Sequence, residues 1–186
     1  MRMKKVVLVL AILLSSLANA QFEIGTSLID PILNRATLTV SYNFDNRMAV
    51  SLKSGFLYGY KPHIAFSEDF KPSQRGAFFQ FTARYYLQSI QNKGYYAGLF
   101  MHKTDFQYRD KRDVSMGNLD FYRKSLTTGI LFGKKQWIAP QLMLDYAFGI
   151  GAFLNYELKY YNNEDVDAIL VATALGIFNV GIHYRF

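Results

Sequence analysis

The stretch Phe178-Asn179-Val180-Gly181-Ile182-His183-Tyr184-Arg185-Phe186 decides the fold of this chain. Apolar side chains stand at every second position, and polar residues or glycine stand between them. Because neighbouring side chains of a β-strand point to opposite faces, a period of two predicts a strand with one apolar and one polar face. We therefore expect the chain to finish on an amphipathic strand whose last residue is the aromatic Phe186.

Seven further segments show the same alternation. They cover residues 22–28, 36–44, 48–60, 77–88 and 121–132, and two more begin near residues 95 and 141. Repeated short segments with a period of two, separated by turn residues, are typical of a membrane β-barrel. The predicted fold class is therefore all-β, an eight-stranded antiparallel transmembrane up-and-down β-barrel.

The connections between these segments alternate in length. Residues 45–47, 89–94 and 133–138 form short connections, whereas residues 59–76, 107–120 and 161–167 form long polar ones. Residues 29–35 form a shorter connection on the side of the long ones. Membrane barrels have short turns at one end and longer loops at the other. An even number of strands then places both termini at the end with the short turns.

The seventh segment predicts an unusually tall hairpin. Its alternation continues through Leu154, Tyr156, Leu158 and Tyr160, and residues 168–175 are compatible with a strand. We expect the tip of this hairpin at residues 162–165. Its rim would carry Phe153, Tyr156, Tyr160 and Tyr161.

The first twenty residues have the pattern of a signal peptide. Positive Arg2, Lys4 and Lys5 precede the apolar run of residues 6–14, and Ala18-Asn19-Ala20 provides small residues for cleavage. The apolar run is too short for a membrane-spanning helix, which needs about 20 residues. The predicted division is a signal peptide at residues 1–20 and a barrel domain at residues 21–186. The chain has no cysteine, which excludes disulfides, cysteine metal sites and lipid attachment through cysteine.

Composition excludes few other classes but agrees with a barrel. The net charge is +7, part of it in the predicted signal peptide, and the basic residues are scattered, so we expect no nucleic-acid partner. Aromatic residues make up 17% of the chain, with 14 Tyr and 16 Phe. Tyrosine-rich alternation fits a membrane barrel, whose aromatic residues gather at the two interfaces.

Charged side chains share the polar face of the predicted strands. Eight of them are expected to form a polar network in the lumen: Glu23, Lys53, Arg84, His102, Arg123, Asp145, His183 and Arg185. Charges that share a small lumen can pair and fill it, which lowers the cost of their desolvation. A soluble lipocalin-like barrel, with the apolar face inside, is the alternative that periodicity alone does not exclude. A metal site formed by His102 and His183 with Asp145 or Glu23 is a weaker interpretation, because the spacing matches no metal motif, and no cofactor is expected.

The last strand resembles the C-terminal signal read by the outer-membrane assembly machinery of Gram-negative bacteria. The residues of that pattern are Phe178, Val180, Ile182, Tyr184 and Phe186. Length, strand number and ending resemble the small outer-membrane barrels of the OmpA- and OmpX-like group. Three segments are most similar to a family of short barrels of unknown function: Asp30-Pro31, Ala83-Arg84-Tyr85-Tyr86 and the glycine-rich residues 144–151.

The resemblance implies a location, the outer membrane of a Gram-negative bacterium. The even number of strands then places both termini in the periplasm. The expected partners are outer-membrane lipids and lipopolysaccharide, the assembly machinery that reads the C-terminal signal, and a protein bound at the outer loops and tall hairpin. Near the outer rim, Lys103, Arg109 and Lys124 could bind lipopolysaccharide phosphates, although basic side chains that reach out of an apolar belt would look the same.

The expected function is a non-enzymatic barrel whose loops and tall hairpin serve envelope structure or interaction at the surface. Two alternatives stay open. An outer-leaflet acyltransferase or deacylase could use His63, Ser67 and Asp69, which have the side-chain types of nucleophilic acyl chemistry. A narrow channel is the other, although eight strands enclose only enough space for side chains or one small ligand.

Overall fold

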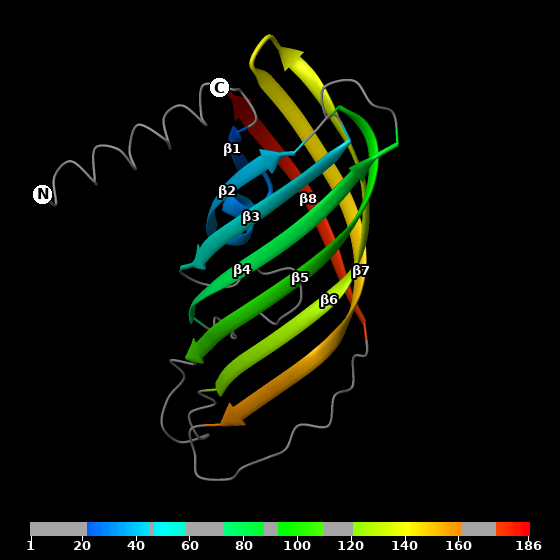
Figure 1. Cartoon of the computed structure of the whole chain (residues 1–186). Coiled ribbons are helices and arrows are strands. Elements are labelled where there is room, and N and C mark those ends of the chain that lie inside the picture. Colours follow the sequence, from blue (N-terminus) through cyan, green and yellow to red (C-terminus); the bar gives the residue numbers. More distant parts are fainter. Residues whose placement is uncertain (1–21, 45–46, 59–72, 88–92, 110–120, 161–173) are drawn as a thin grey trace, which may run out of the picture.

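The computed structural model describes residues 22–44, 47–58, 73–87, 93–109, 121–160 and 174–186. Within these ranges, antiparallel strands close into a barrel in which each strand pairs with its neighbours in the chain and the first pairs with the last (Figure 1). The strands are β1 (Phe22–Ser27), β2 (Arg35–Asn43), β3 (Met48–Leu57), β4 (Ser73–Tyr86), β5 (Gly94–Arg109), β6 (Phe121–Ala139), β7 (Leu142–Tyr160) and β8 (Ala174–Arg185). The predicted eight-stranded up-and-down barrel is confirmed.

The barrel is apolar outside and polar inside. Leu99 and Phe148 face outward and are 63% and 59% exposed, whereas Glu23 and Asp145 face inward and are 0% exposed. This arrangement is the reverse of a soluble barrel, whose interior is filled by apolar side chains. The structure therefore confirms the predicted direction of the alternation. Among the described residues, no helix is long and apolar enough to span a membrane.

The hairpin of β6 and β7 corrects the predicted turn at residues 133–138. These residues continue β6, which runs to Ala139, and the turn lies at Pro140 and Gln141. The alternation persists through this part of the strand, so that Lys135 faces the lumen and is 1% exposed. The polar run around Lys134 and Lys135 suggested a turn, but one lysine faces out and the other is paired inside.

A β-bulge corrects the predicted alternation at the far end of β7. Thr127 pairs with Phe153 and Leu126 pairs with Asn155, so Leu154 is an extra residue in the ladder. A one-residue shift reverses the faces of everything beyond it. Tyr156 is therefore paired with Ser125 on the inner face, and the prediction that Tyr156 continues the outward row is wrong. The predicted tip of this hairpin and Tyr161 lie outside the described residues.

The strands differ greatly in length. β1 has 6 residues, whereas β6 and β7 have 19 each. β4 begins at Ser73 and β5 continues to Arg109, so strand replaces parts of the predicted loops at residues 59–76 and 107–120. The wall formed by β5, β6 and β7 is therefore taller than the wall formed by β1, β2 and β3, as Figure 1 shows.

The connection between β1 and β2 contains a short 3₁₀ helix, η1 (Asp30–Leu33). Pro31 stands at its start, where its missing N–H group costs nothing. Asn34 ends the helix in the left-handed conformation, with φ of 55°. This tight connection holds the Asp30 side chain, which is buried, at the mouth of the lumen beside Lys53.

Candidate functional site

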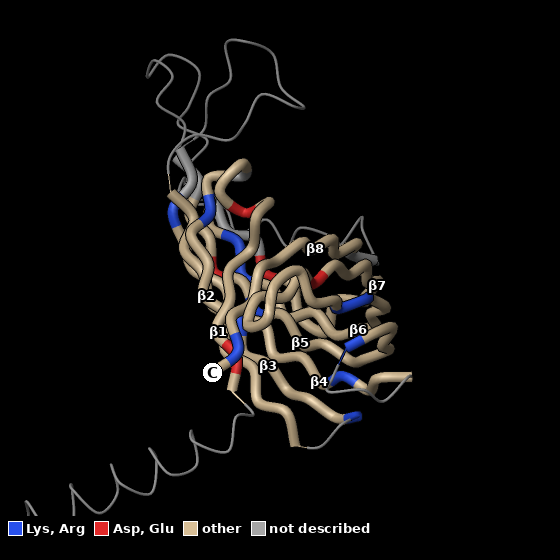
Figure 2. Tube along the Cα trace, turned by 90° about the horizontal axis from the view of Figure 1, so that it is seen from above, with Lys and Arg blue, Asp and Glu red and all other residues tan. Residues whose placement is uncertain are grey.

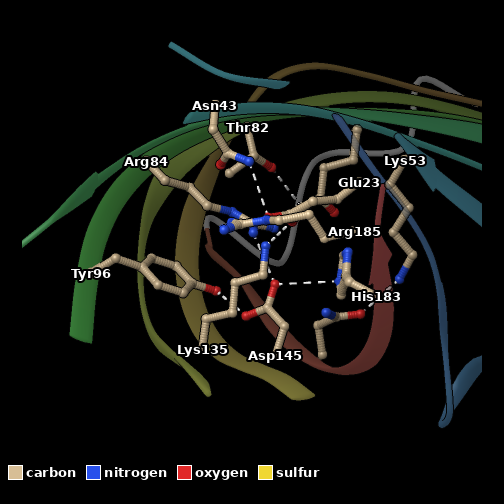
Figure 3. Close-up of polar contacts among 12 residues, drawn as sticks. Glu23, Asn43, Lys53, Thr82, Arg84, Tyr96, Lys135, Asp145, His183 and Arg185 are labelled. Atoms are coloured by element: carbon tan, nitrogen blue, oxygen red, sulfur yellow. Dashed lines mark hydrogen bonds and ion pairs between the residues drawn. The ribbon is translucent and has the colours of Figure 1, made fainter. Parts of the chain in front are cut away.

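The candidate site is a chain of buried ion pairs inside the barrel (Figure 3). Its side chains come from six strands and from η1, and those on the strands stand at inward positions of the alternation. Buried charges are stable only when they are paired and hydrogen-bonded. The partners of each carboxylate therefore decide what the lumen can do.

Glu23 on β1 is the centre of the first cluster. Lys135 on β6 and Arg185 on β8 both donate to its carboxylate, and Arg185 Nε lies 3.0 Å from Oε1. Asn43 on β2 donates to the same oxygen at 3.0 Å. β6 is not a neighbour of β1, so the Lys135 side chain crosses the lumen to reach Glu23. In Figure 2 an acidic position on β1 and a basic position beside the C-terminus lie together, as their pairing in the sheet requires.

Asp145 on β7 is the centre of the second cluster. Its Oδ2 atom lies 2.9 Å from an Arg84 nitrogen, and Tyr96 donates its hydroxyl to Oδ1 at 2.7 Å. The Arg84 guanidinium also lies 5.1 Å from the centre of the Tyr96 ring. His183 Nε2 lies 3.5 Å from the same carboxylate oxygen as Arg84. Because β4 and β7 are not neighbours, the Arg84–Asp145 pair is a second bridge across the lumen.

Lys53 on β3 makes the third bridge, nearer the end that carries η1. Its Nζ atom lies 2.6 Å from Asp30 Oδ2 and donates to Asn179 Oδ1 at 2.9 Å. Asn179 stands on β8, which is not adjacent to β3. Three bridges at different places thus tie opposite walls together and occupy the interior.

His102 and Arg123 face the lumen but join no carboxylate in the described part of the chain. The His102 ring packs against Phe78 with centroids 5.5 Å apart, and the Arg123 guanidinium lies 5.4 Å from the Phe106 centroid. Among the described residues, no group of three or more His, Asp or Glu side chains is placed to hold a metal ion. The structure therefore divides the two histidines between an aromatic contact and the Asp145 cluster.

Sequence reasoning missed several members of the network. The composition of residues 133–138 predicts a turn at Lys135, although Lys135 stands at the same parity along the strand as Leu131, which is also buried. Tyr96, Asn43 and Asn179 stand at inward positions, but an uncharged side chain gives no sign of which carboxylate or ammonium group it will meet. Only closure of the barrel brings these side chains to their partners.

Other predicted residues are placed less fully. His63, Ser67 and Asp69 lie outside the described residues, and so does the side chain of Arg109. Lys103 is exposed on the outer face, and Lys124 lies 4.8 Å from the centre of the Tyr122 ring. The outer row of β8 and the residue after it includes Phe178, Tyr184 and Phe186, which are 65%, 40% and 55% exposed.

A family model described as "Protein of unknown function (DUF3575)" matches residues 6–183. The chain belongs to this family. None of the curated proteins matches it. Membership of DUF3575 therefore covers nearly all of the described barrel but brings no activity or ligand with it.

Solved structures similar to this DUF3575 member are small barrels. A major outer membrane protein from Thermus thermophilus is 13% identical with a TM-score of 0.51, over 90% of this chain and 99% of that one. Neisserial surface protein A (NspA) is 12% identical with a TM-score of 0.46, over 90% and 96%. The N-terminal β-barrel domain of Pseudomonas aeruginosa OprF is 9% identical with a TM-score of 0.44, over 90% and 98%. At such low identity the likeness to the Thermus protein shows the fold alone, and the predicted resemblance to small outer-membrane barrels is confirmed at that level.

Proposed function

We propose that this chain is a non-enzymatic integral outer-membrane barrel that serves envelope structure or interaction at the cell surface. The observation that carries the proposal is the reversed polarity of the barrel. Large apolar side chains such as Leu99, Phe148 and Phe178 stand exposed outside, while Glu23 and Asp145 are completely buried inside. A lipid environment requires that the backbone hydrogen bonds of the strands be satisfied within a closed sheet and that apolar side chains cover its outside.

The lumen supports a structural role over transport. The Glu23–Lys135, Arg84–Asp145 and Lys53–Asp30 pairs occupy the interior from the terminal end to η1. Phe100, Tyr86 and Tyr96 fill the space between them and are almost completely buried. Eight strands leave room for little else.

The arrangement of the ends supports both termini in the periplasm. Phe186 N–H donates to Phe22 C=O, so the two ends of the described chain lie together. The tight β6–β7 turn lies at this end as well, since Arg185 donates its N–H to Gln141 C=O. Short turns at the end that carries the termini are the arrangement of outer-membrane barrels. The exposed apolar row of β8 would be the surface that the assembly machinery reads.

The tall wall of β6 and β7 supports the interaction role. These strands have 19 residues each, well above the 9 to 11 or so that span a membrane. A pair of strands that rises above the bilayer could add a partner's strand or carry a binding loop. Deleting residues 156–171 is expected to leave folding intact and to abolish recovery of a cross-linked surface partner. Deleting residues 110–118 is expected to leave both folding and recovery of the partner unchanged.

Gel mobility of membrane-extracted protein tests the barrel itself. We expect the protein in the outer-membrane fraction, with a mobility that changes on boiling because the closed barrel resists detergent until it is heated. A soluble periplasmic protein without such a shift would contradict the proposal. Unchanged mass spectra of envelope lipids after deletion of the gene are expected, and altered acylation would favour the acyltransferase alternative.

A further inference from the structure

A groove opens on the outer face of β3, β4 and β5, at the end of the barrel opposite the termini. Its volume is about 760 Å³. Phe56, Ala77 and Phe79 provide its apolar lining, and Arg75, Lys103 and Gln107 provide polar groups. None of these side chains takes part in the buried network of the lumen, so the structural role proposed above leaves the groove unexplained.

The sequence creates the groove by setting a small residue among large ones. Phe56 pairs with Ala77 across β3 and β4, and Ala77 pairs with Asp105 across β4 and β5. One row lower, Phe79 pairs with Lys103. Phe56 and Phe79 are 66% and 52% exposed, so the methyl group of Ala77 leaves a depression between two aromatic side chains. Such a depression in an outer apolar face fits a hydrocarbon chain.

Two cations border this depression. Arg75 pairs with Gln107 in the row above Ala77, and Lys103 stands in the row below. The Lys103 side chain is exposed on the outer face. Asp105, the carboxylate among the lining residues, accepts a hydrogen bond from the Tyr122 hydroxyl at 3.2 Å. Two cations against one engaged carboxylate make the groove complementary to a negative head group.

We infer that this groove binds the phosphorylated head group of an anionic membrane lipid, whose acyl chain lies over Phe56, Ala77 and Phe79. Arg75 supplies planar, charge-assisted hydrogen bonds to phosphate, and Lys103 reaches along the apolar wall to place its ammonium group on the same anion. The inference rests on the proposed function, since the groove faces lipid only when the barrel spans a membrane. The occupant is a lipid rather than a free anion, because Phe56, Ala77 and Phe79 give the groove an apolar lining beside its cations.

The test is native mass spectrometry of the full chain, extracted in neutral detergent, stripped of lipid and titrated with phosphatidylglycerol or phosphatidylcholine. We expect preferential retention of phosphatidylglycerol. The double variant Arg75→Gln, Lys103→Gln should lose that preference by about tenfold or more, the effect expected from losing two charge-assisted contacts. Ala77→Trp, which fills the groove and keeps both charges, should weaken retention of either lipid.

A matched control removes a cation elsewhere on the outer face. Lys134 lies 5.1 Å from the centre of the Tyr95 ring, at the end of the barrel that carries the termini. Lys134→Gln is expected to retain phosphatidylglycerol as the wild type does. All changed positions face outward, and a heat-dependent mobility shift of each variant establishes that it is folded. If the double variant lacks the heat-dependent mobility shift, the single variants Arg75→Gln and Lys103→Gln replace it in the lipid titration.

Several results would overturn the inference while leaving the proposed barrel intact. Equal retention of phosphatidylglycerol by the wild type and the double variant would do so. Complete competition by millimolar inorganic phosphate would mean a site for a free anion, and a dimer lost in Ala77→Trp would mean that a second copy occupies the groove. Failure of the proposed function looks different: the wild type itself would then be absent from the outer-membrane fraction.

Discussion

At position 23 a completely buried carboxylate receives an ammonium and a guanidinium group. Glu23→Ala would leave the buried Lys135 and the half-buried Arg185 without that partner. Removing one member of a buried ion pair typically costs about 3–5 kcal/mol, so we expect a loss of that size in the free energy of unfolding. Urea unfolding can be followed by tryptophan fluorescence, because Trp137 is the single tryptophan and its ring centre lies 5.0 Å from the Arg185 guanidinium.

Lys134, which precedes Lys135 on β6 and faces outward, provides the control for this variant. Lys134 is half-buried and its ammonium lies 5.1 Å from the Tyr95 ring centre, so Lys134→Ala should lower the free energy of unfolding by about 1 kcal/mol or less. The double variant Glu23→Gln, Lys135→Met should recover part of the stability lost in Glu23→Gln alone. If Glu23→Ala were no more harmful than Lys134→Ala, the ion pair would not stabilise the barrel.

Gly151 matters because of what lies against it. Phe100 on β5 pairs with Gly129 on β6, which pairs with Gly151 on β7. The Phe100 ring lies beside Gly149 and Gly151, two β7 residues without side chains. A Cβ atom at Gly151 would stand 2.7 Å from Phe100 Cζ. Gly151→Val is expected to destabilise the barrel by about 1–3 kcal/mol, as overpacked cores do. The unfolding midpoint in urea measures this.

Gly176 provides the matched substitution, because a Cβ atom there would meet nothing within 4 Å. Gly176→Val should unfold at nearly the wild-type urea concentration. Equal effects at the two positions would mean that strand propensity, and not the contact with Phe100, decides the response.

At the scale of an element, the bulge at Leu154 reverses the faces of β7. Asn155 pairs with Leu126 on the outer side, and Tyr156 pairs with Ser125 on the inner side. The chain has no cysteine, so a single cysteine introduced by mutation can carry a fluorescent label. In vesicles that contain nitroxide lipids, we expect quenching of a label on Asn155→Cys and little quenching of one on Tyr156→Cys.

Leu99→Cys is the positive control for quenching, since Leu99 is 63% exposed on the outer face. Quenching at Tyr156→Cys but not at Asn155→Cys would restore the unbroken alternation and remove the bulge. The bulge was not predictable from the sequence, because Phe153, Leu154 and Tyr156 satisfy either register. Its position depends on how β7 is aligned with β6.

The β6–β7 turn shows a different limit at the same scale. Gly133, Lys134 and Lys135 have the composition of a turn, and a local view of the sequence favours one there. The period of two nevertheless continues through these residues, and Pro140, which lacks a backbone donor, stands at the true turn. The alternation of inward and outward residues along the strand was the better guide to the position of the turn, because it reflects burial on one face of the sheet.

For the whole molecule, the three bridges across the lumen predict that the barrel does not conduct ions as an open pore. The bridges and the buried rings of Phe100 and Tyr86 leave the interior filled. Purified protein in planar bilayers should therefore give no stable conductance steps of the size that an open pore gives. An open porin measured in the same bilayers provides the reference. Reproducible ohmic steps from the wild type would contradict the closed lumen and favour the channel alternative.

The sequence by itself determined the number of strands, the face on which most residues stand and the choice of charged residues for the interior. These properties are local, because a period of two can be recognised in each segment separately. A charged side chain on the inward face is buried only if it is paired, so its place in the sequence already indicates an ion pair. Only the tertiary structure decided which partner. Lys135 and Glu23 are 112 positions apart, and they meet because closing β1 onto β8 sets the register of every strand between them. Register and closure depend on all eight strands together, so no single segment could reveal them.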